Sequence, residues 1–338
     1  MQMTRRYWLA ALCTLAVLWG ASSAQAQTNK LLPNDTEMIV TINLQQILKS
    51  EVLKANKTLV DVAKQKIEEK LDDNGTAKFL KQAGFDLFTD LASITISMPG
   101  NRDVGEGFVV LEGKFDAAKI AAAATEASKD AGEGLKAIEI ANIKAFQVTK
   151  KEDGKTIYVG VLNTKTMIAS TSKADFAEAA GRLTGSKQAA FKTEFKNLLT
   201  PIKNTQSISM VATSDVLVKL FEKAPEGAGD QLKQVAVFLK QMEGISAALT
   251  MQKDIDFQLS VNTKEEKTAM EYQNLVNLGL GVAKTKVAEK AKDDEKFAAA
   301  LTVLNSIRAT ATGANLMIRG QITFETLEKV LQNLPIGN

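Results

Sequence analysis

The chain has 338 residues, of which 45% are hydrophobic and 24% are charged, and its formal net charge at pH 7 is +3. These values are typical of a folded globular protein with one large or two ordinary domains, and they argue against nucleic acid or an anionic membrane surface as a partner. The sequence contains no histidine, which excludes a Ser-His-Asp triad and every metal site built on histidine ligands.

The first 26 residues have the pattern of a secretory signal peptide. Arg5-Arg6 precede an apolar run over residues 7–19, and Ala24 and Ala26 provide the small residues of a cleavage site. This pattern predicts a mature chain that begins at Gln27 and lies outside the cytoplasm, in the periplasm or secreted. The apolar run is shorter than the ~20 residues that a membrane-spanning helix needs, so no retained transmembrane anchor is expected.

The same segment bears on the export route and on redox chemistry. Residues 4–9 also resemble a twin-arginine signal, but no cofactor-loading motif follows, so the general export route is favoured. The single cysteine, Cys13, lies within the apolar run. The mature chain is therefore expected to have no thiol, no disulfide and no ordinary zinc, haem or iron–sulfur site, and its stability must come from an apolar core.

A strand that passes directly into a helix opens the mature chain. Residues alternate between two faces in 37–42, and from Leu44 the apolar residues follow the spacing of one helical face. Asp116 and Ser172 are candidate N-caps, and Asp153-Gly154 predicts a tight hairpin. Further strands are predicted at 93–98, 108–115, 143–149, 155–161 and 166–170, and further helices at 59–71, 76–83, 117–129, 174–183 and 191–199.

The strand-to-helix opening recurs at Ser207–Phe221, where Ser214 or Asp215 is the candidate cap, and Thr263 with Glu266 predicts a capping box. The order of elements after it also recurs. The sequence therefore predicts an α+β fold of two related units, 27–200 and 201–338, each a mostly antiparallel sheet with helices packed on one face. In the second unit strands are predicted at 244–251, 256–261 and 316–322, and helices at 230–242, 264–290, 294–307 and 324–334.

Two phrases resemble a broad group of uncharacterised secreted bacterial proteins. The first is Leu32-Pro33-Asn34-Asp35-Thr36, and the second runs from Gly84-Phe85-Asp86 to Asp90-Leu91-Ala92-Ser93-Ile94-Thr95. The resemblance covers the first part of the mature chain and is not carried past Gly185. It implies export and an α+β fold, and it implies no activity, because no catalytic residue is attached to this group.

The candidates for catalysis are weak. Ser170 and Lys173 form the S-x-x-K phrase of acyl enzymes in which an amine activates a serine hydroxyl. The companion phrases of those enzymes are missing, and a helix start uses serine as a cap, so capping is the favoured interpretation. Asp86 and Asp90 could serve as an acid and a base, but their spacing near a strand entry favours turn formation.

Three further motifs have ordinary structural interpretations. In a calcium loop built on Asp72-Asp73-Asn74-Gly75 the first and twelfth ligand positions would be Lys70 and Lys81, so a helix stop is predicted. Gly279-Leu280-Gly281 lies within a helical pattern, which predicts a packing or kink role. Asp293-Asp294-Glu295 is expected to complement a helix N-terminus.

We therefore expect an exported, non-enzymatic envelope protein, without cofactors, that binds a protein partner or an apolar small molecule. Architecture motivates this expectation, because a curved sheet under long apolar helices can leave a groove. The alternative is a histidine-free hydrolase that uses carboxylates or the Ser170 and Lys173 pair.

Overall fold

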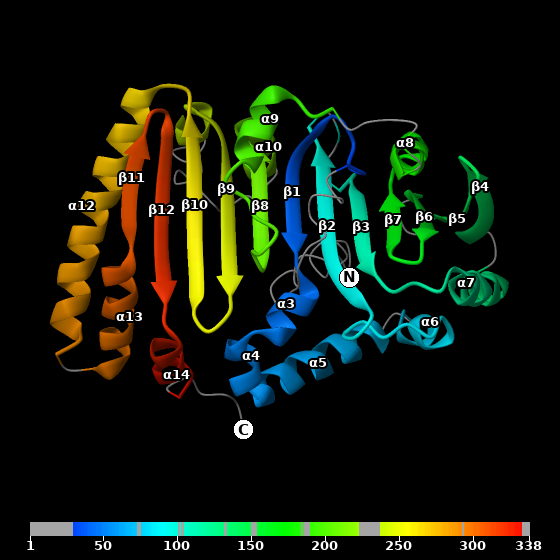
Figure 1. Cartoon of the computed structure of the whole chain (residues 1–338), viewed down its shortest axis with the longest axis horizontal. Helices are drawn as coiled ribbons and strands as arrows, with labels where there is room; N and C mark the ends of the chain where they lie inside the picture. Colours follow the sequence, from blue (N-terminus) through cyan, green and yellow to red (C-terminus); the bar gives the residue numbers. More distant parts are fainter. Residues whose placement is uncertain are drawn as a thin grey trace. The chain divides into compact units, whose positions relative to one another are not determined.

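The computed structural model describes residues 30–72, 76–100, 102, 105–131, 134–149, 154–183, 185, 190–222, 237–292 and 294–332. The predicted signal peptide, with Ala24, Ala26 and Gln27, lies outside the described residues. The described residues form helices and antiparallel strands (Figure 1), which confirms the α+β class. They divide into two compact units.

Unit 1 comprises residues up to 49 together with 56–193 and 203–208, and its sheet has the strand order β1-β2-β3-β7-β6-β5-β4. Each pair of neighbours in this order is antiparallel. The strands are β1 Thr36–Ile42, β2 Leu91–Pro99, β3 Phe108–Gly113, β4 Leu135–Ile140, β5 Ile143–Thr149, β6 Thr156–Asn163 and β7 Thr166–Ser170. The helices are α3 Leu44–Lys49, α5 Lys57–Asp72, α6 Thr76–Gln82, α7 Ala117–Ala131 and α8 Lys173–Leu183.

The structure confirms most predicted elements of unit 1, shortens one strand and adds another. The predicted strand 108–115 ends at Gly113, because the backbone N–H groups of Lys114 and Phe115 bond to carbonyls of two separate loops. The strand β4 was not predicted. It joins β5 through Ala141 and Asn142, which both have positive φ, the signature of a two-residue hairpin turn.

Unit 2 comprises residues 50–55, 194–202 and 209 onward, and its sheet has the order β8-β9-β10-β12-β11. The pairs β9–β10, β10–β12 and β11–β12 are antiparallel. The strands are β8 Ile208–Thr213, β9 Met242–Met251, β10 Ile255–Thr263, β11 Arg308–Thr312 and β12 Asn315–Ile322. The helices are α4 Glu51–Ala55, α9 Thr193–Leu199, α10 Ser214–Glu222, α12 Glu266–Lys290, α13 Glu295–Ser306 and α14 Phe324–Gln332.

Two predicted caps in unit 2 are wrong. The hydroxyl of Thr263, the last residue of β10, donates to the carbonyls of Glu265 and Ala314. The N-cap residue of α12 is Glu265, and no side-chain hydrogen bond caps that helix. The N–H of Val216 in α10 is accepted by Thr213 Oγ1 at 3.4 Å, one residue before the predicted cap.

Two predicted elements of unit 2 also need correction. The helix predicted over 230–242 is wrong at its end, because Met242 begins β9, and residues up to 236 lie outside the described part. The strand β11 was not predicted.

The sheet of unit 1 has one face that is buried along its central row, and we call it the inner face. Helix α8 covers part of it, since a Cβ placed on Gly160 would lie 2.7 Å from Phe176 Cζ. Only a glycine therefore allows this approach. A buried row crosses the inner face, in which each residue is the cross-strand partner of the next: Thr41, Thr95, Val110, Ile168, Gly160 and Ala145.

Candidate functional site

The geometry around Ser170 does not form a serine–lysine pair. Ser170 is 1% exposed and accepts a hydrogen bond from the N–H of Ser172 at 3.0 Å, while Lys173 is exposed. Ser172 Oγ accepts from the N–H of Asp175 at 3.2 Å, which confirms Ser172 as the cap of α8. The hydroxyl of Ser170 is thus closed to solvent and held by the backbone, which is a structural arrangement.

The opening phrase of the mature chain is held by a buried arginine of α8. Arg182 donates to the carbonyl of Leu32 and, at 2.7 Å, to Asn34 Oδ1, which also accepts the N–H of Ala190. Thr36 closes the turn, because its hydroxyl donates to the carbonyl of Pro33 at 2.7 Å. The phrase 32–36 therefore fixes the start of β1 against α8.

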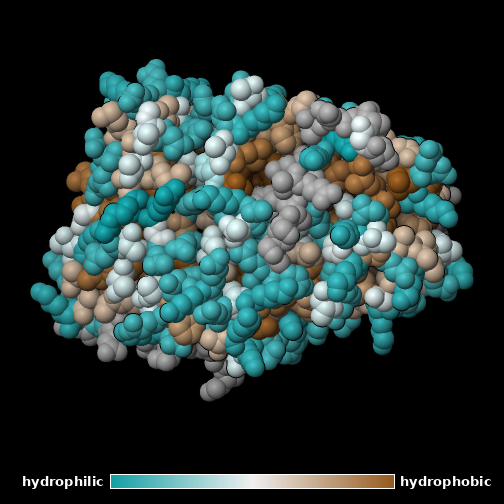
Figure 2. Space-filling model, viewed as in Figure 1, coloured by the Kyte–Doolittle hydropathy of each residue, from teal (hydrophilic) through white to brown (hydrophobic). Residues whose placement is uncertain are grey.

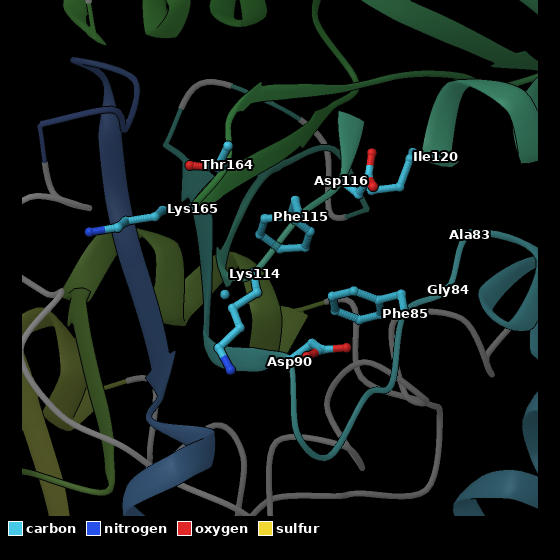
Figure 3. A pocket seen from close by; sticks show the side chains of 11 residues that line it. Ala83, Gly84, Phe85, Asp90, Lys114, Phe115, Asp116, Ile120, Thr164 and Lys165 are labelled. Atoms are coloured by element: carbon cyan, nitrogen blue, oxygen red, sulfur yellow. The ribbon is translucent and has the colours of Figure 1, made fainter. Parts of the chain in front are cut away.

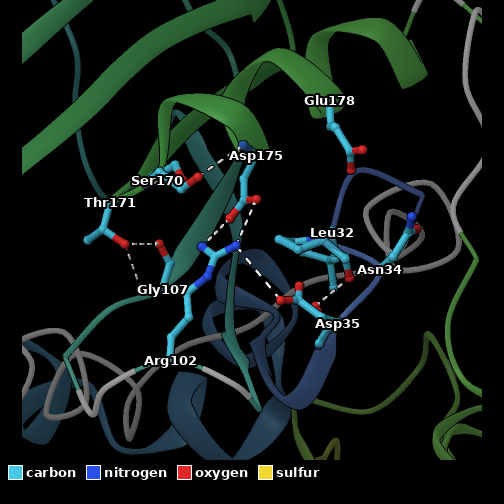
Figure 4. Close-up of polar contacts among 12 residues, drawn as sticks. Leu32, Asn34, Asp35, Arg102, Gly107, Ser170, Thr171, Asp175 and Glu178 are labelled. Carbon is cyan, nitrogen blue, oxygen red and sulfur yellow. Dashed lines mark hydrogen bonds and ion pairs between the residues drawn. The ribbon is translucent and has the colours of Figure 1, made fainter.

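An ion pair between Arg102 and Asp175 fixes the same region (Figure 4). Both terminal nitrogens of Arg102 contact the carboxylate of Asp175, one of them at 2.9 Å, and Asp35 lies 3.8 Å from the guanidinium. The hydrogen bond with Asp175 raises the pKa of the Arg102 guanidinium above its ordinary value, against the opposing effect of burial. The guanidinium of Arg102 therefore stays charged, and its contacts with Asp175 and Asp35 serve as a clamp.

The second phrase begins at the end of α6. Gly84 has φ +62, its N–H bonds to the carbonyl of Lys81, and the N–H of Phe85 bonds to the carbonyl of Leu80. This is the Schellman arrangement, in which a glycine in the left-handed region ends a helix.

The two carboxylates of the second phrase form a turn. Asp86 Oδ1 accepts the N–H groups of Phe88 and Thr89, and Asp90 Oδ2 accepts the N–H of Asp86 at 2.9 Å. The turn prediction is confirmed. Since these oxygens hold the backbone, Asp86 and Asp90 have no geometry of an acid and a base.

The phrase also lines an open pocket with a volume of about 520 Å³, which Figure 3 shows. The rings of Phe85 and Phe115 stack in it, with centroids 5.3 Å apart and planes within 8°. The carboxylate of Asp116 caps α7 by accepting the N–H groups of Ala118 and Lys119 at 3.0 Å, as predicted. The remaining lining residues are Ala83, Gly84, Asp90, Gly113, Lys114, Ile120, Thr164 and Lys165.

The pocket combines an aromatic floor with a charged rim. Phe115 is 4% exposed, whereas Lys114 and Lys165 are exposed. Asp116 also lies 3.8 Å from the ammonium of Lys119. The pocket can therefore hold an apolar group against the two rings. The carboxylates of Asp90 and Asp116 already accept backbone N–H groups, and that of Asp116 also lies near the ammonium of Lys119.

The face of the unit 1 sheet opposite the inner face, which we call the outer face, is half-buried and apolar. Most of the surface seen in Figure 2 is hydrophilic, with hydrophobic residues gathered in a few places. On the outer face a row from β1 to β5 contains only apolar side chains, each the cross-strand partner of the next: Val40, Ile96, Val109, Ala169, Val159 and Phe146. Beside it, two half-buried apolar pairs extend the surface: Met38 with Met98, and Met167 with Val161.

The outer face reverses the usual pattern of an antiparallel sheet. Such a sheet normally packs its apolar face on the core and presents polar residues to water. Here the buried inner face carries the polar side chains, among them Thr41, which bonds to Thr95, and Ser93, whose hydroxyl donates to Glu112 at 2.8 Å. The outer face, which is partly exposed, carries no polar side chain in the row from β1 to β5. This row is therefore a candidate interaction surface.

Two other classes of site find no support in the described part of the chain. Within it, no three acidic side chains gather closely enough to hold a metal ion. None of the helices described there is long and apolar enough to cross a bilayer. Asp73, Asn74, Gly75 and Asp293, which belong to motifs of the sequence analysis, lie outside the described residues.

Comparison with known proteins gives no family for this chain. No family model matches the sequence, no curated protein is similar to it, and no solved structure matches its fold.

Proposed function

We propose that the protein is an exported, non-enzymatic binding protein of the cell envelope, and that the outer face of unit 1 binds an apolar surface of a protein partner. The unbroken apolar row from Val40 to Phe146 is the observation that carries the proposal. Export rests on the sequence of the first 26 residues.

The physical basis is the free energy gained by removing this surface from water. Each Å² of apolar surface that a partner covers contributes about 25 cal/mol. The row lies on strands that hydrogen bonds hold in register, so little conformational entropy is lost on binding. A partner with a flat or helical apolar surface fits such a face, because its side chains can pack between those of neighbouring strands.

We also infer that the two units are related by duplication. The order of elements supports this: β1 leads into α3 and β8 into α10, while β3 leads into α7 and β10 into α12. The strand that returns beside the third strand is followed by a helix in both units, as in β7 with α8 and β12 with α14.

The duplication indicates what kind of surface the outer face would accept. Under this match the outer pair Ile96 and Val109 corresponds to Leu249 and Phe257, which are cross-strand partners in unit 2. The strands of unit 2 pack on that side against α12, whose Tyr272 and Val276 join a cluster with Val261. In the described part of unit 1 the matching helix, α7, packs against α6 and β4. An apolar helix of a partner would supply the cover that α12 gives to unit 2.

The pocket supports a second candidate function. Its volume of about 520 Å³ lies within the range of small-molecule sites. The stacked rings of Phe85 and Phe115 would contact an apolar or aromatic group, and the exposed Lys114 and Lys165 would contact an anionic group on the same molecule. The hydrolase alternative has no comparable observation, since the hydroxyl of Ser170 is buried.

Substitution of Val109 by glutamate tests the proposal. Val109 lies in the middle of the apolar row, so a charge there would be desolvated by any apolar partner. The matched control is Ala174→Glu, which adds the same charge at an exposed position in the first turn of α8, a helix of the inner face. Binding of a fluorescent apolar dye such as anilinonaphthalene sulfonate is measured for the three proteins.

We expect V109E to weaken dye binding at least ~5-fold and A174E to leave it unchanged. Equal binding by all three proteins would show that the outer face is not the apolar site. If V109E fails to fold, Met98→Gln makes a milder change on the same face. Lipid analysis of the protein purified after export distinguishes a bound lipid from a protein partner, and intact mass tests cleavage before Gln27.

A further inference from the structure

The helix α12 carries large apolar side chains on its exposed side. Leu275 is 55% exposed, Leu278 is 68% exposed and Val282 is 50% exposed. Their spacing of three and four residues places them in one stripe along the helix, about 10 Å long. On the opposite side Tyr272 and Val276 pack into the core of unit 2. The helix is therefore apolar on two sides, of which one is covered.

The glycines of this helix add to the stripe. Among the described residues nothing lies within 4 Å of a Cβ placed on Gly279 or Gly281, so the packing role predicted for them finds no partner there. The helix continues from Glu266 to Lys290, so the glycines do not end it. A glycine costs a helix about 1 kcal/mol relative to alanine. Here Gly279 leaves an open recess beside Leu278.

The charges at the two ends of the stripe are of opposite sign. Glu271 lies four residues before Leu275 and Lys286 lies four residues after Val282, and both are exposed. Their midpoint falls between residues 278 and 279, which is also the midpoint of Leu275 and Val282. A two-fold axis at that point would place Glu271 of one copy opposite Lys286 of the other, and Leu278 opposite Gly279.

We propose that α12 is a self-association surface on which two copies of the chain pack their helices antiparallel about this axis. The stripe is self-complementary in both shape and charge, as an isologous interface requires. A parallel arrangement would instead place like charges together. Because the stripe is smaller than the core of a standard interface, the dimer should be weak, with a dissociation constant on the order of 10–100 µM.

Sedimentation equilibrium of the purified protein and a set of exposed-site variants tests this proposal. Leu278→Glu should weaken dimerisation at least ~10-fold. Met270→Glu is the matched control, because Met270 is 55% exposed on the same helix but lies on a different side of it. It should leave the dissociation constant unchanged.

Charge exchange tests the antiparallel register. Glu271→Lys alone and Lys286→Glu alone should each weaken the dimer ~3-fold or more, and the double exchange should restore it to within ~2-fold of the original. A protein that stays monomeric at about 500 µM would overturn the proposal. So would a dimer that M270E weakens as much as L278E does, or one that the single exchanges leave unchanged.

Discussion

Substitution of Arg182 by methionine tests whether the opening phrase is a structural anchor. Methionine keeps the length and apolar character of the stem but removes the guanidinium, whose side chain is 2% exposed. The carbonyl of Leu32 loses its donor, Asn34 Oδ1 keeps only the N–H of Ala190, and Glu178 loses its ion pair.

The expected cost follows from these three partners. A hydrogen bond to a charged group contributes about 1.5–3 kcal/mol. Of the two such bonds to the opening phrase, the one to Leu32 is buried and the one to Asn34 is partly buried. The pair with the partly exposed Glu178 adds about 0.5 kcal/mol or less. The substitution recovers part of the lost free energy of unfolding, because it also removes the Nε–H of Arg182, which is buried without a hydrogen-bond partner. We expect R182M to lower the free energy of unfolding by about 2–4 kcal/mol.

The sequence provides a reporter for this measurement. From Gln27 onward the chain has no tryptophan, and its tyrosines are Tyr158 in unit 1 and Tyr272 in unit 2. In a Tyr272→Phe background the tyrosine fluorescence therefore reports unit 1 alone. Urea unfolding of R182M is compared with Glu178→Gln, which should cost about 0.5 kcal/mol or less. If R182M costs no more than E178Q, the opening phrase is not anchored by Arg182.

Three further predictions concern packing, pH and the serine–lysine motif. Gly160→Ala should lower the stability of unit 1 by about 1–3 kcal/mol, because its Cβ would lie 2.7 Å from Phe176 Cζ; urea unfolding at an unchanged midpoint would contradict this. Burial, with a smaller contribution from the charge of Glu271, raises the pKa of the Tyr272 hydroxyl. The folded state then holds this proton more tightly, so the stability of unit 2 that is present below pH ~10 should fall as pH rises through the folded pKa, and Y272F should remove that loss in a pH series. Lys173→Ala should change the free energy of unfolding by less than about 0.5 kcal/mol, because the side chain is exposed, and a larger change in urea unfolding would reveal a partner.

The sequence predicts strands best where alternation involves large apolar side chains. The predicted strand Thr166–Ser170 matches β7 to the residue. The two strands that were not predicted, β4 and β11, are short: β11 contains only alanine, threonine and an arginine, and in β4 a lysine and a glutamate interrupt the apolar residues. Their turns were nevertheless readable, because Asn142 and Gly313 are residue types that tolerate positive φ.

The candidate site was less accessible from sequence, because alternation shows which residues share a face but not which face a helix covers. In β2 the serines and threonine at 93, 95 and 97 would ordinarily face water, yet they are buried, while Ile96 and Met98 are partly exposed. This assignment depends on the packing of α8, which follows the sheet in the sequence. The aromatic stack was equally hidden, because the two strands β2 and β3 separate Phe85 from Phe115 in the sequence.

Site-specific photo-crosslinking in the envelope of living cells tests the central claim most directly. A photoreactive phenylalanine analogue replaces Val109 on the outer face or Ala174 on the exposed start of α8. A discrete adduct of higher mass is expected from position 109 and none from position 174. No adduct at position 109, or the same adducts from both positions, would contradict the claim that the outer face of unit 1 is a binding surface.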